Sequence, residues 1–210
     1  MNSVQIKVCG VTSIKDAKAC AEADIDMIGL NFYSRSPRAI APTTAREIVA
    51  ALPARMEAVG VFVDASAEEI RAIAKAVGIT AVQLHGEISS QTCRELAREF
   101  RVIRAFHTNK DFRPETTASF SDCDILLDAH HPELRGGTGQ TCDWSMARAI
   151  LPFTRFLILS GGLNAENVGA ALNEVAPNAV DLCSGVESAP GVKDRAAIQK
   201  FVAAVHGNEL

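Results

Sequence analysis

Two side chains suited to proton transfer each stand at the end of a short apolar run. Cys9 ends the run 4–9 and is followed by Gly10, and Asp128 ends the run 125–128. An ionised thiol acts as a base, and a desolvated carboxyl group acts as a general acid because burial raises its pKa. Cys9 is therefore a candidate base or nucleophile, with a small buried core residue as the alternative. Asp128 is a candidate general acid, with a helix cap or a loop anchor as the alternative.

Two glycine turns near the end of the sequence have the form of a phosphate site. Gly161 and Gly162 follow the apolar segment 156–160, and Ser184 and Gly185 follow the segment 179–182. Backbone N–H groups at the start of a helix are unpaired and bind anions readily. Two such turns after successive strands predict a phosphorylated small-molecule substrate. A third glycine cluster, 136–139, lacks the Lys-Ser/Thr ending of a P-loop and fits a loop that closes over a substrate.

Arg38 and His85 are candidate substrate contacts. Arg38 follows Ser36-Pro37, and its planar guanidinium suits two-point binding of a carboxylate, with a solvated loop charge as the equal alternative. His85 follows the apolar run 81–84, where a substrate contact and a hydrogen-bonded structural histidine are both open. Asp64, at the end of the run 57–63, is explained by capping the next helix.

The elements that must position these side chains alternate along the whole chain between short apolar strands and longer helical segments. Continuous apolar strands separated by helices are typical of a parallel sheet covered on both faces, either a closed barrel or an open doubly wound sheet. Eight such units in 210 residues predict a single (β/α)₈ barrel over residues 1–210, with its active site at the carboxyl ends of the strands. Strands are expected at 4–9, 27–32, 57–63, 81–84, 102–106, 125–128, 156–160 and 179–182. Helices are expected at 13–23, 43–52, 66–77, 89–100, 144–151, 165–175 and 193–205, and one short helix within 108–121.

Composition narrows the possible partners. A net charge of −4 and an aromatic content of 5% argue against a nucleic-acid partner. Lys7, Lys15, Asp16 and Lys18 exclude an apolar signal-peptide segment, and no apolar run is long enough to span a membrane. The six cysteines form no C-x-x-C pair, and no histidine completes a zinc spacing, so no metal is expected and the thiols are expected to be reduced in the cytoplasm.

Eight short motifs, taken in order, resemble the phosphoribosylanthranilate isomerase family of tryptophan biosynthesis over nearly the whole chain. They lie at 7–12, 29–38, 61–64, 82–87, 126–128, 136–144, 160–164 and 184–194. The resemblance implies a cofactor-free (β/α)₈ barrel that carries out an Amadori rearrangement. The chain is expected to be a monomer or a homodimer. The resemblance implies Cys9 as general base, Asp128 as general acid and Arg38 as the group that holds the anthranilate carboxylate. It also implies phosphate binding by Gly161, Gly162, Ser184 and Gly185. Asn31, Cys142 and Cys183 depart from the family pattern.

Other functions remain open from the residues alone. An indoleglycerol-phosphate synthase-like barrel needs a lysine acid, for which only Lys7 stands inside a strand near its end. An epimerase-like barrel needs a metal or paired aspartates, which Asp64 and Asp128 could supply. A non-catalytic phosphate-binding barrel needs neither Cys9 nor Asp128. A catalytic Cys9 is expected to react with alkylating reagents below the ordinary thiol pKa of ~8.5.

Overall fold

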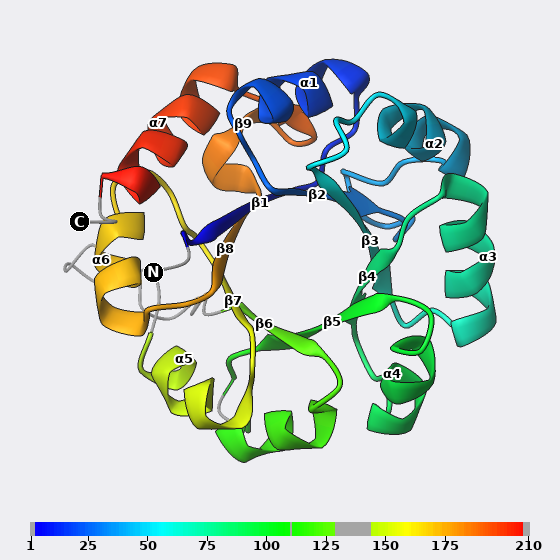
Figure 1. Ribbon diagram of the computed structural model, residues 1–210, viewed down its shortest axis with the longest axis vertical. Helices are drawn as coiled ribbons and strands as arrows, with labels where there is room; N and C mark the ends of the chain where they lie inside the picture. The colour runs from blue at the N-terminus through cyan, green and yellow to red at the C-terminus, as the bar shows by residue number, and fades with distance from the viewer. Residues whose placement is uncertain (1–2, 110, 129–143, 208–210) are drawn as a thin grey trace.

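Eight parallel strands close into one barrel in sequence order in the computed structural model, which describes residues 3–109, 111–128 and 144–207. Figure 1 shows the helices as a ring around the strands. The closing contact pairs β1 with β8, so the prediction of a closed barrel is confirmed and the open sheet is excluded. The strands are β1 (Gln5–Cys9), β2 (Met27–Asn31), β3 (Glu57–Val63), β4 (Ala81–His85), β5 (Arg101–His107), β6 (Asp124–Asp128), β7 (Leu157–Ser160) and β8 (Ala179–Leu182). The helices are α1 (Ile14–Glu22), α2 (Pro42–Ala50), α3 (Ala67–Val77), α4 (Ser90–Leu96), α5 (Ser145–Ile150), α6 (Val168–Val175) and α7 (Arg195–His206).

Alternation along each strand divides the core into two clusters. Successive side chains of a strand point to opposite faces, so every second residue enters the barrel and the others meet the helices. Ile6 and Val8 belong to the cluster between strands and helices, whereas Lys7 and Cys9 face the interior. The interior is filled by a separate apolar cluster, formed by Met27, Val59, Ala81, Ile103, Ala105, Leu126, Ile158 and Ala179. The barrel is therefore a packed core and not a pore, and the active site of such a barrel lies at the carboxyl ends of its strands.

Local hydrogen bonds explain where the helices begin. Ser66 accepts a hydrogen bond from the Glu69 backbone and caps α3, so the Asp64 side chain does not cap it. Asp64 instead accepts from the Glu87 backbone N–H and joins the loops after β3 and β4. The Asn164 side chain accepts from the backbone N–H groups of Glu166 and Asn167, which holds those residues in a turn and delays α6.

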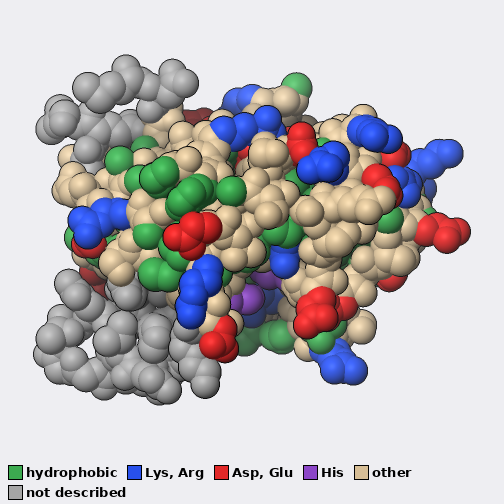
Figure 2. Space-filling model, turned by 90° about the horizontal axis from the view of Figure 1, so that it is seen from below, with side chains coloured by type: hydrophobic (Ala, Val, Ile, Leu, Met, Phe, Trp, Pro, Cys, Tyr) green, Lys and Arg blue, Asp and Glu red, His purple; other side chains and the backbone are tan. Residues whose placement is uncertain are grey.

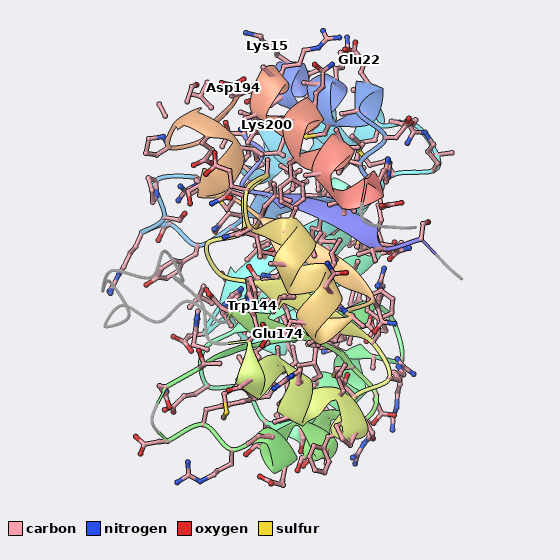
Figure 3. All side chains as sticks on the ribbon, turned by 90° about the vertical axis from the view of Figure 1, so that its left-hand side faces the viewer. Lys15, Glu22, Trp144, Glu174, Asp194 and Lys200 are labelled. Atoms are coloured by element: carbon pink, nitrogen blue, oxygen red, sulfur yellow. The ribbon has the colours of Figure 1, made fainter. Side chains whose placement is uncertain are left out.

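The short helix expected within 108–121 is a 3₁₀-helix, η1 (Pro114–Phe120). The chain also contains short elements that periodicity did not predict, and the first is a 3₁₀-helix, η2 (Leu151–Phe153), that follows α5. After β8 come a three-residue 3₁₀-helix, η3 (Ser184–Val186), and a two-stranded antiparallel hairpin, β9 (Glu187–Ala189) and β10 (Val192–Lys193). Asp194 then caps α7, which lies beside α6 on the face of the barrel seen in Figure 3. Among the described helices, none is long and apolar enough to cross a membrane.

A half-buried ion cluster closes the amino-terminal end of the barrel. Arg101 at the start of β5 donates to Glu57 of β3 over 2.6 Å and to Asp124 of β6 over 2.7 Å. Its guanidinium also lies 5.0 Å from the centre of the Phe156 ring. One guanidinium therefore neutralises two carboxylates from strands on either side of it. Removing it takes the nearest cation from both and leaves Asp124 only the more distant Arg155, whose Nε lies 3.8 Å away.

We expect Arg101→Met to lower the free energy of unfolding by about 2 kcal/mol, because two half-buried carboxylates lose their shared cation. Chemical denaturation at neutral pH measures the change. The matched control is Arg71→Met, whose ion pair with Glu99 is well exposed, and its expected loss is below about 0.5 kcal/mol. Equal losses in the two variants would contradict a structural role for the cluster.

Candidate active site

A cavity of about 270 Å³ at the carboxyl ends of the strands brings the predicted acid and both glycine turns together. It is lined, among others, by Asp128, Ser160, Gly161, Gly162, Ser184 and Gly185. A larger cavity, of about 350 Å³, lies at the opposite end, beside the starts of β3 and β4. Since none of the predicted site residues lines that larger cavity, we assign the site to the smaller one.

The backbone conformation and close packing of the two glycine turns require residues without a side chain. Gly161 and Gly162 have φ values of +103° and +68°, a region that favours glycine. A Cβ on Gly185 would overlap the carbonyl oxygen of Leu163, which shows how closely the second turn packs against the first. The segment from Ser184 is a single turn of 3₁₀-helix rather than the start of a longer helix. Backbone atoms of both turns thus border one cavity, where an anion can approach them.

A buried ion pair that the sequence did not reveal lies inside the barrel next to this cavity. The Lys7 side chain is fully buried, and its Nζ is 2.8 Å from Oδ1 of Asp181. The Ser160 hydroxyl donates to the other Asp181 oxygen over 3.3 Å. Burial alone lowers the pKa of Lys7, but the charges of Asp181 and Cys9 outweigh it and raise that pKa. Lys7 is therefore a permanent cation in the interior.

Cys9 ends β1 two residues after Lys7 and points to the same interior side. Burial is the main influence on its thiol and raises its pKa above the ordinary value. The nearby Lys7 and Lys193 charges lower that pKa in part, while Asp181 raises it further. This direction argues against the expectation that Cys9 reacts below the ordinary thiol pKa, because desolvation outweighs the cations in the ligand-free site.

We expect the rate of Cys9 alkylation by iodoacetamide to rise only above the pH at which an exposed thiol ionises. Lys7→Met should move that pH higher because it removes the nearest cation, and Asp181→Asn should move it lower because it removes an anion. Mass spectrometry of the Cys9 peptide over a pH series measures both changes. Shifts in the same direction would contradict control of the thiol by the Lys7–Asp181 pair.

Asp128 at the end of β6 lies among groups from β4 and β5. The Asp128 Oδ2 atom is 3.4 Å from Nδ1 of His107, and the Thr108 N–H donates to the Asp128 carbonyl oxygen. The ring of His85 lies 5.8 Å from that of His107, centre to centre. Burial, followed by the charges of His107 and Lys7, lowers the His85 pKa to about 4, so this ring is neutral near pH 7. Figure 2 shows histidine side chains (purple) set back in a hollow between basic and acidic groups.

His85 has a hydrogen-bond partner of its own. Nε2 of Gln83 donates to Nε2 of His85 over 2.7 Å. This contact agrees with the alternative that His85 is a hydrogen-bonded structural residue. His85 is nevertheless close to the site, because its ring lies beside that of His107, which contacts Asp128. The role of His85 in substrate binding stays a prediction.

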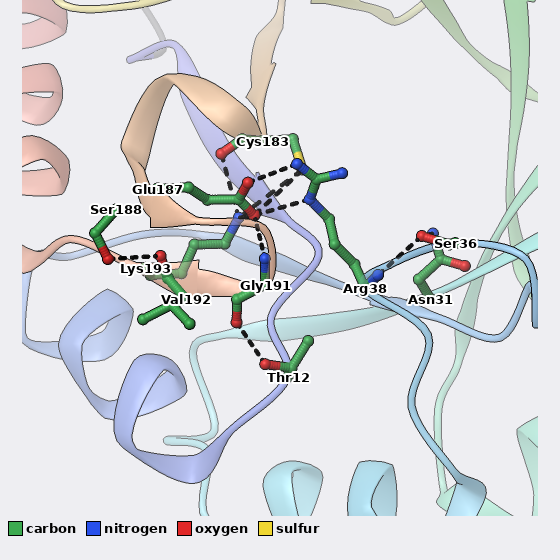
Figure 4. Close-up of polar contacts among 10 residues, drawn as sticks. All are labelled: Thr12, Asn31, Ser36, Arg38, Cys183, Glu187, Ser188, Gly191, Val192 and Lys193. Atoms are coloured by element: carbon green, nitrogen blue, oxygen red, sulfur yellow. Dashed lines mark hydrogen bonds and ion pairs between the residues drawn. The ribbon is translucent and has the colours of Figure 1, made fainter.

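Arg38 belongs to a second network that the sequence did not predict, drawn in Figure 4. Its Nε and Nη2 atoms donate to the two carboxylate oxygens of Glu187 over 2.8 and 2.6 Å. Glu187 also accepts from the buried Lys193 and from the Gly191 N–H. Burial raises the Glu187 pKa, but the hydrogen bonds from Arg38 and Lys193 outweigh it and lower the pKa to about 2. The β9–β10 hairpin thereby holds the loop that carries Arg38.

The positions that depart from the family pattern take part in the same network where they are described. Asn31 accepts from the Tyr33 N–H and donates to the Ser36 hydroxyl, which in turn accepts from the Arg38 N–H. The Cys183 thiol lies 3.8 Å from a Glu187 oxygen, and its pKa is raised to about 12, chiefly by burial. Cys142 and the glycine cluster 136–139 lie outside the described residues. In the described part of the chain, no group of three or more His, Cys, Asp or Glu could hold a metal ion.

Known proteins share this fold and much of this sequence. The family model described as "N-(5'phosphoribosyl)anthranilate (PRA) isomerase" matches residues 6–204. A relative named N-(5'-phosphoribosyl)anthranilate isomerase, from Chlorobium phaeobacteroides, is 42% identical over 97% of this chain and 98% of its own. The crystal structure of phosphoribosyl anthranilate isomerase from Thermotoga maritima is 42% identical, has a TM-score of 0.90 and covers 97% of this chain and 99% of its own.

A further solved isomerase of the same name is described in complex with reduced 1-(o-carboxyphenylamino)-1-deoxyribulose 5-phosphate. It is 39% identical, has a TM-score of 0.87, and covers 97% of this chain and 99% of its own. Family, sequence and structure therefore agree over almost the entire chain. The chain belongs to the N-(5'-phosphoribosyl)anthranilate isomerase family, the isomerases of tryptophan biosynthesis.

Proposed function

We propose that this chain isomerises N-(5-phosphoribosyl)anthranilate to 1-(2-carboxyphenylamino)-1-deoxyribulose 5-phosphate without a cofactor, with Cys9 as general base and Asp128 as general acid. The observation that carries the proposal is the single cavity that Asp128 shares with both glycine turns. The Lys7–Asp181 pair joins Cys9 to that cavity, since Asp181 also lines it. The cytoplasm, where thiols stay reduced, suits a reaction that depends on a free Cys9 thiol.

The phosphate end of the substrate fits the two glycine turns. Gly161 and Gly162 leave β7, Ser184 and Gly185 leave β8, and both turns lie at the rim where phosphate sites of such barrels form. In the proposed complex, their backbone N–H groups and the Ser184 hydroxyl hold the 5′-phosphate. This places the ribose ring above β6 and β1, between Asp128 and Cys9.

The acid step opens the ring. The Asp128 carboxyl gives its proton to the ribose ring oxygen as the bond from C1′ to that oxygen breaks, and the nitrogen lone pair forms a protonated Schiff base. The partly exposed Asp128 carboxyl lies at the edge of the cavity, where it can reach that oxygen. Each acid–base contribution of this kind is typically ~10²–10⁴-fold in rate.

The base step completes the isomerisation. The Cys9 thiolate removes the C2′ proton, whose acidity the neighbouring iminium raises, and the enolamine so formed becomes the ketone. Since burial raises the Cys9 pKa, the thiolate is a minor form in the ligand-free site. The fixed cation of Lys7 is the interaction that keeps this form accessible.

The anthranilate carboxylate fits Arg38. Glu187 occupies the Nε and Nη2 edge of this guanidinium, so the substrate carboxylate is proposed to bind from the Nη1 side. Glu187 thereby fixes the plane of the guanidinium before the substrate arrives. Asp64 supports no paired-aspartate chemistry with Asp128, since its carboxylate accepts from the Glu87 N–H in a neighbouring loop.

We expect Cys9→Ala and Asp128→Asn each to lower kcat/KM by ~10²–10⁴-fold, because each loses one proton-transfer group. The assay is the loss of the substrate's anthranilate fluorescence on adding purified protein, without metal or nucleotide. Thermal unfolding should show a folded protein in both cases. The control is Cys20→Ala, which removes a thiol on the buried face of α1. Wild-type turnover in Cys9→Ala or in Asp128→Asn would contradict the assignment.

We expect Glu187→Gln to raise KM by about tenfold with a smaller change in kcat, because the Arg38 plane is no longer held by a charged two-point contact. Steady-state kinetics separates the two constants. Glu166→Gln, which removes an exposed pairing with Lys200, is the matched control and should change neither. A fall in kcat at constant KM would show that Glu187 acts on the chemical step instead.

A further inference from the structure

The proposed reaction leaves the two catalytic groups in the wrong protonation states for the next turnover. After one cycle Asp128 has lost a proton to the ring oxygen, and Cys9 has gained one from C2′. The final change from enolamine to ketone moves a proton from O2′ to C1′ and adds none. The cycle therefore closes only when Asp128 regains a proton from solvent and Cys9 releases one.

His107 lies where it can return that proton to Asp128. It is the last residue of β5, and the β5–β6 register pairs it directly with Asp128 at the end of β6. Its Nδ1 atom is 3.4 Å from Oδ2 of Asp128, close enough for a hydrogen bond to tighten when substrate binds. Its side chain is 62% exposed, against 30% for Asp128, so the imidazole reaches solvent better than the carboxylate does.

The surrounding groups act on the pKa of this imidazole in opposite directions. The Asp128 contact raises the His107 pKa from its ordinary value, while burial and the Arg104 charge oppose that increase. On the other side lies His85 of β4, which is neutral because burial holds its pKa at about 4. Arg104, Asp128 and His85 are thus the titratable or charged groups that face His107 from the described strands beside it.

We propose that His107 relays protons between solvent and Asp128, acting through the carboxyl group without touching the substrate. The inference rests on the proposed function of Asp128. In each cycle the imidazole takes up one proton from solvent and passes the proton on Nδ1 to Oδ2, so the carboxyl group re-forms and a neutral ring remains. Cys9 returns its proton to solvent, which balances the cycle, and the exposed ring recovers its tautomer by exchange with water.

The test compares three variants in the fluorescence assay: His107→Ala, His107→Gln and the control His206→Ala at the end of α7. Glutamine keeps a donor for Asp128 but carries no transferable proton, so it separates a relay from a purely structural contact. We expect both His107 variants to lose about tenfold in kcat with KM within about twofold, a smaller loss than for direct acid catalysis. The His206 variant should match the wild type.

Added imidazole provides a second readout that a structural role would not change. At constant pH and ionic strength, kcat of His107→Ala should rise with imidazole concentration, whereas wild-type kcat should not. NMR titration should also show a lower His107 pKa in Asp128→Asn than in the wild type, since the charge that raises it is lost.

The outcomes separate the relay from the function on which it rests. An inactive wild-type protein would overturn the proposed function and the relay together. If the wild type is active, either of two results would overturn the relay alone. One is full kcat in His107→Gln, and the other is a kcat of His107→Ala that does not respond to imidazole. Loss in both His107 variants with recovery by imidazole supports it.

Discussion

The ion pair between Lys7 and Asp181 is the constraint on which the site depends. A fully buried ammonium group costs several kcal/mol unless a carboxylate lies against it, and here the two strands that close the barrel, β1 and β8, provide one group each. Their direct pairing in register puts the two charges opposite one another. Asp181 also accepts from the hydroxyl of Ser160, which precedes the first glycine turn. The Asp181 carboxylate on β8 therefore contacts both β7 at that turn and, through Lys7, the strand β1 that ends in Cys9.

The Lys7–Asp181 pair also bears on the protonation state that the proposed chemistry requires. The reaction needs Cys9 as a thiolate and Asp128 as a carboxylic acid, but burial favours the neutral thiol at Cys9. The Lys7 ammonium group is held in place by packing before the substrate binds. It can therefore favour the Cys9 thiolate without any reorganisation of the site.

The sequence predicted the elements well and the contacts between distant elements poorly. Apolar runs and cap residues located the eight strands and helices such as α3, because those signals are local. Lys7 and Asp181 are 174 residues apart and Arg38 and Glu187 are 149 apart, so no local pattern connects them. The signal that could have found Lys7 was its position inside an apolar strand, where an unpaired charge is costly. His107 directly follows the predicted strand 102–106, but its pairing with Asp128 follows only from the register of β5 and β6.

The pairing of charges explains why glycine turns, and not cations, are the candidate phosphate site. In the described part of the site, Lys7 is paired with Asp181, and Lys193 and Arg38 share Glu187. No lysine or arginine is among the described residues that line the cavity beside the turns. In the proposed complex, the phosphate therefore meets backbone dipoles, whose strength does not change with pH and whose geometry Gly161, Gly162 and Gly185 permit. This division leaves Lys7 to act on Cys9, while Lys193 and Arg38 remain bound to Glu187.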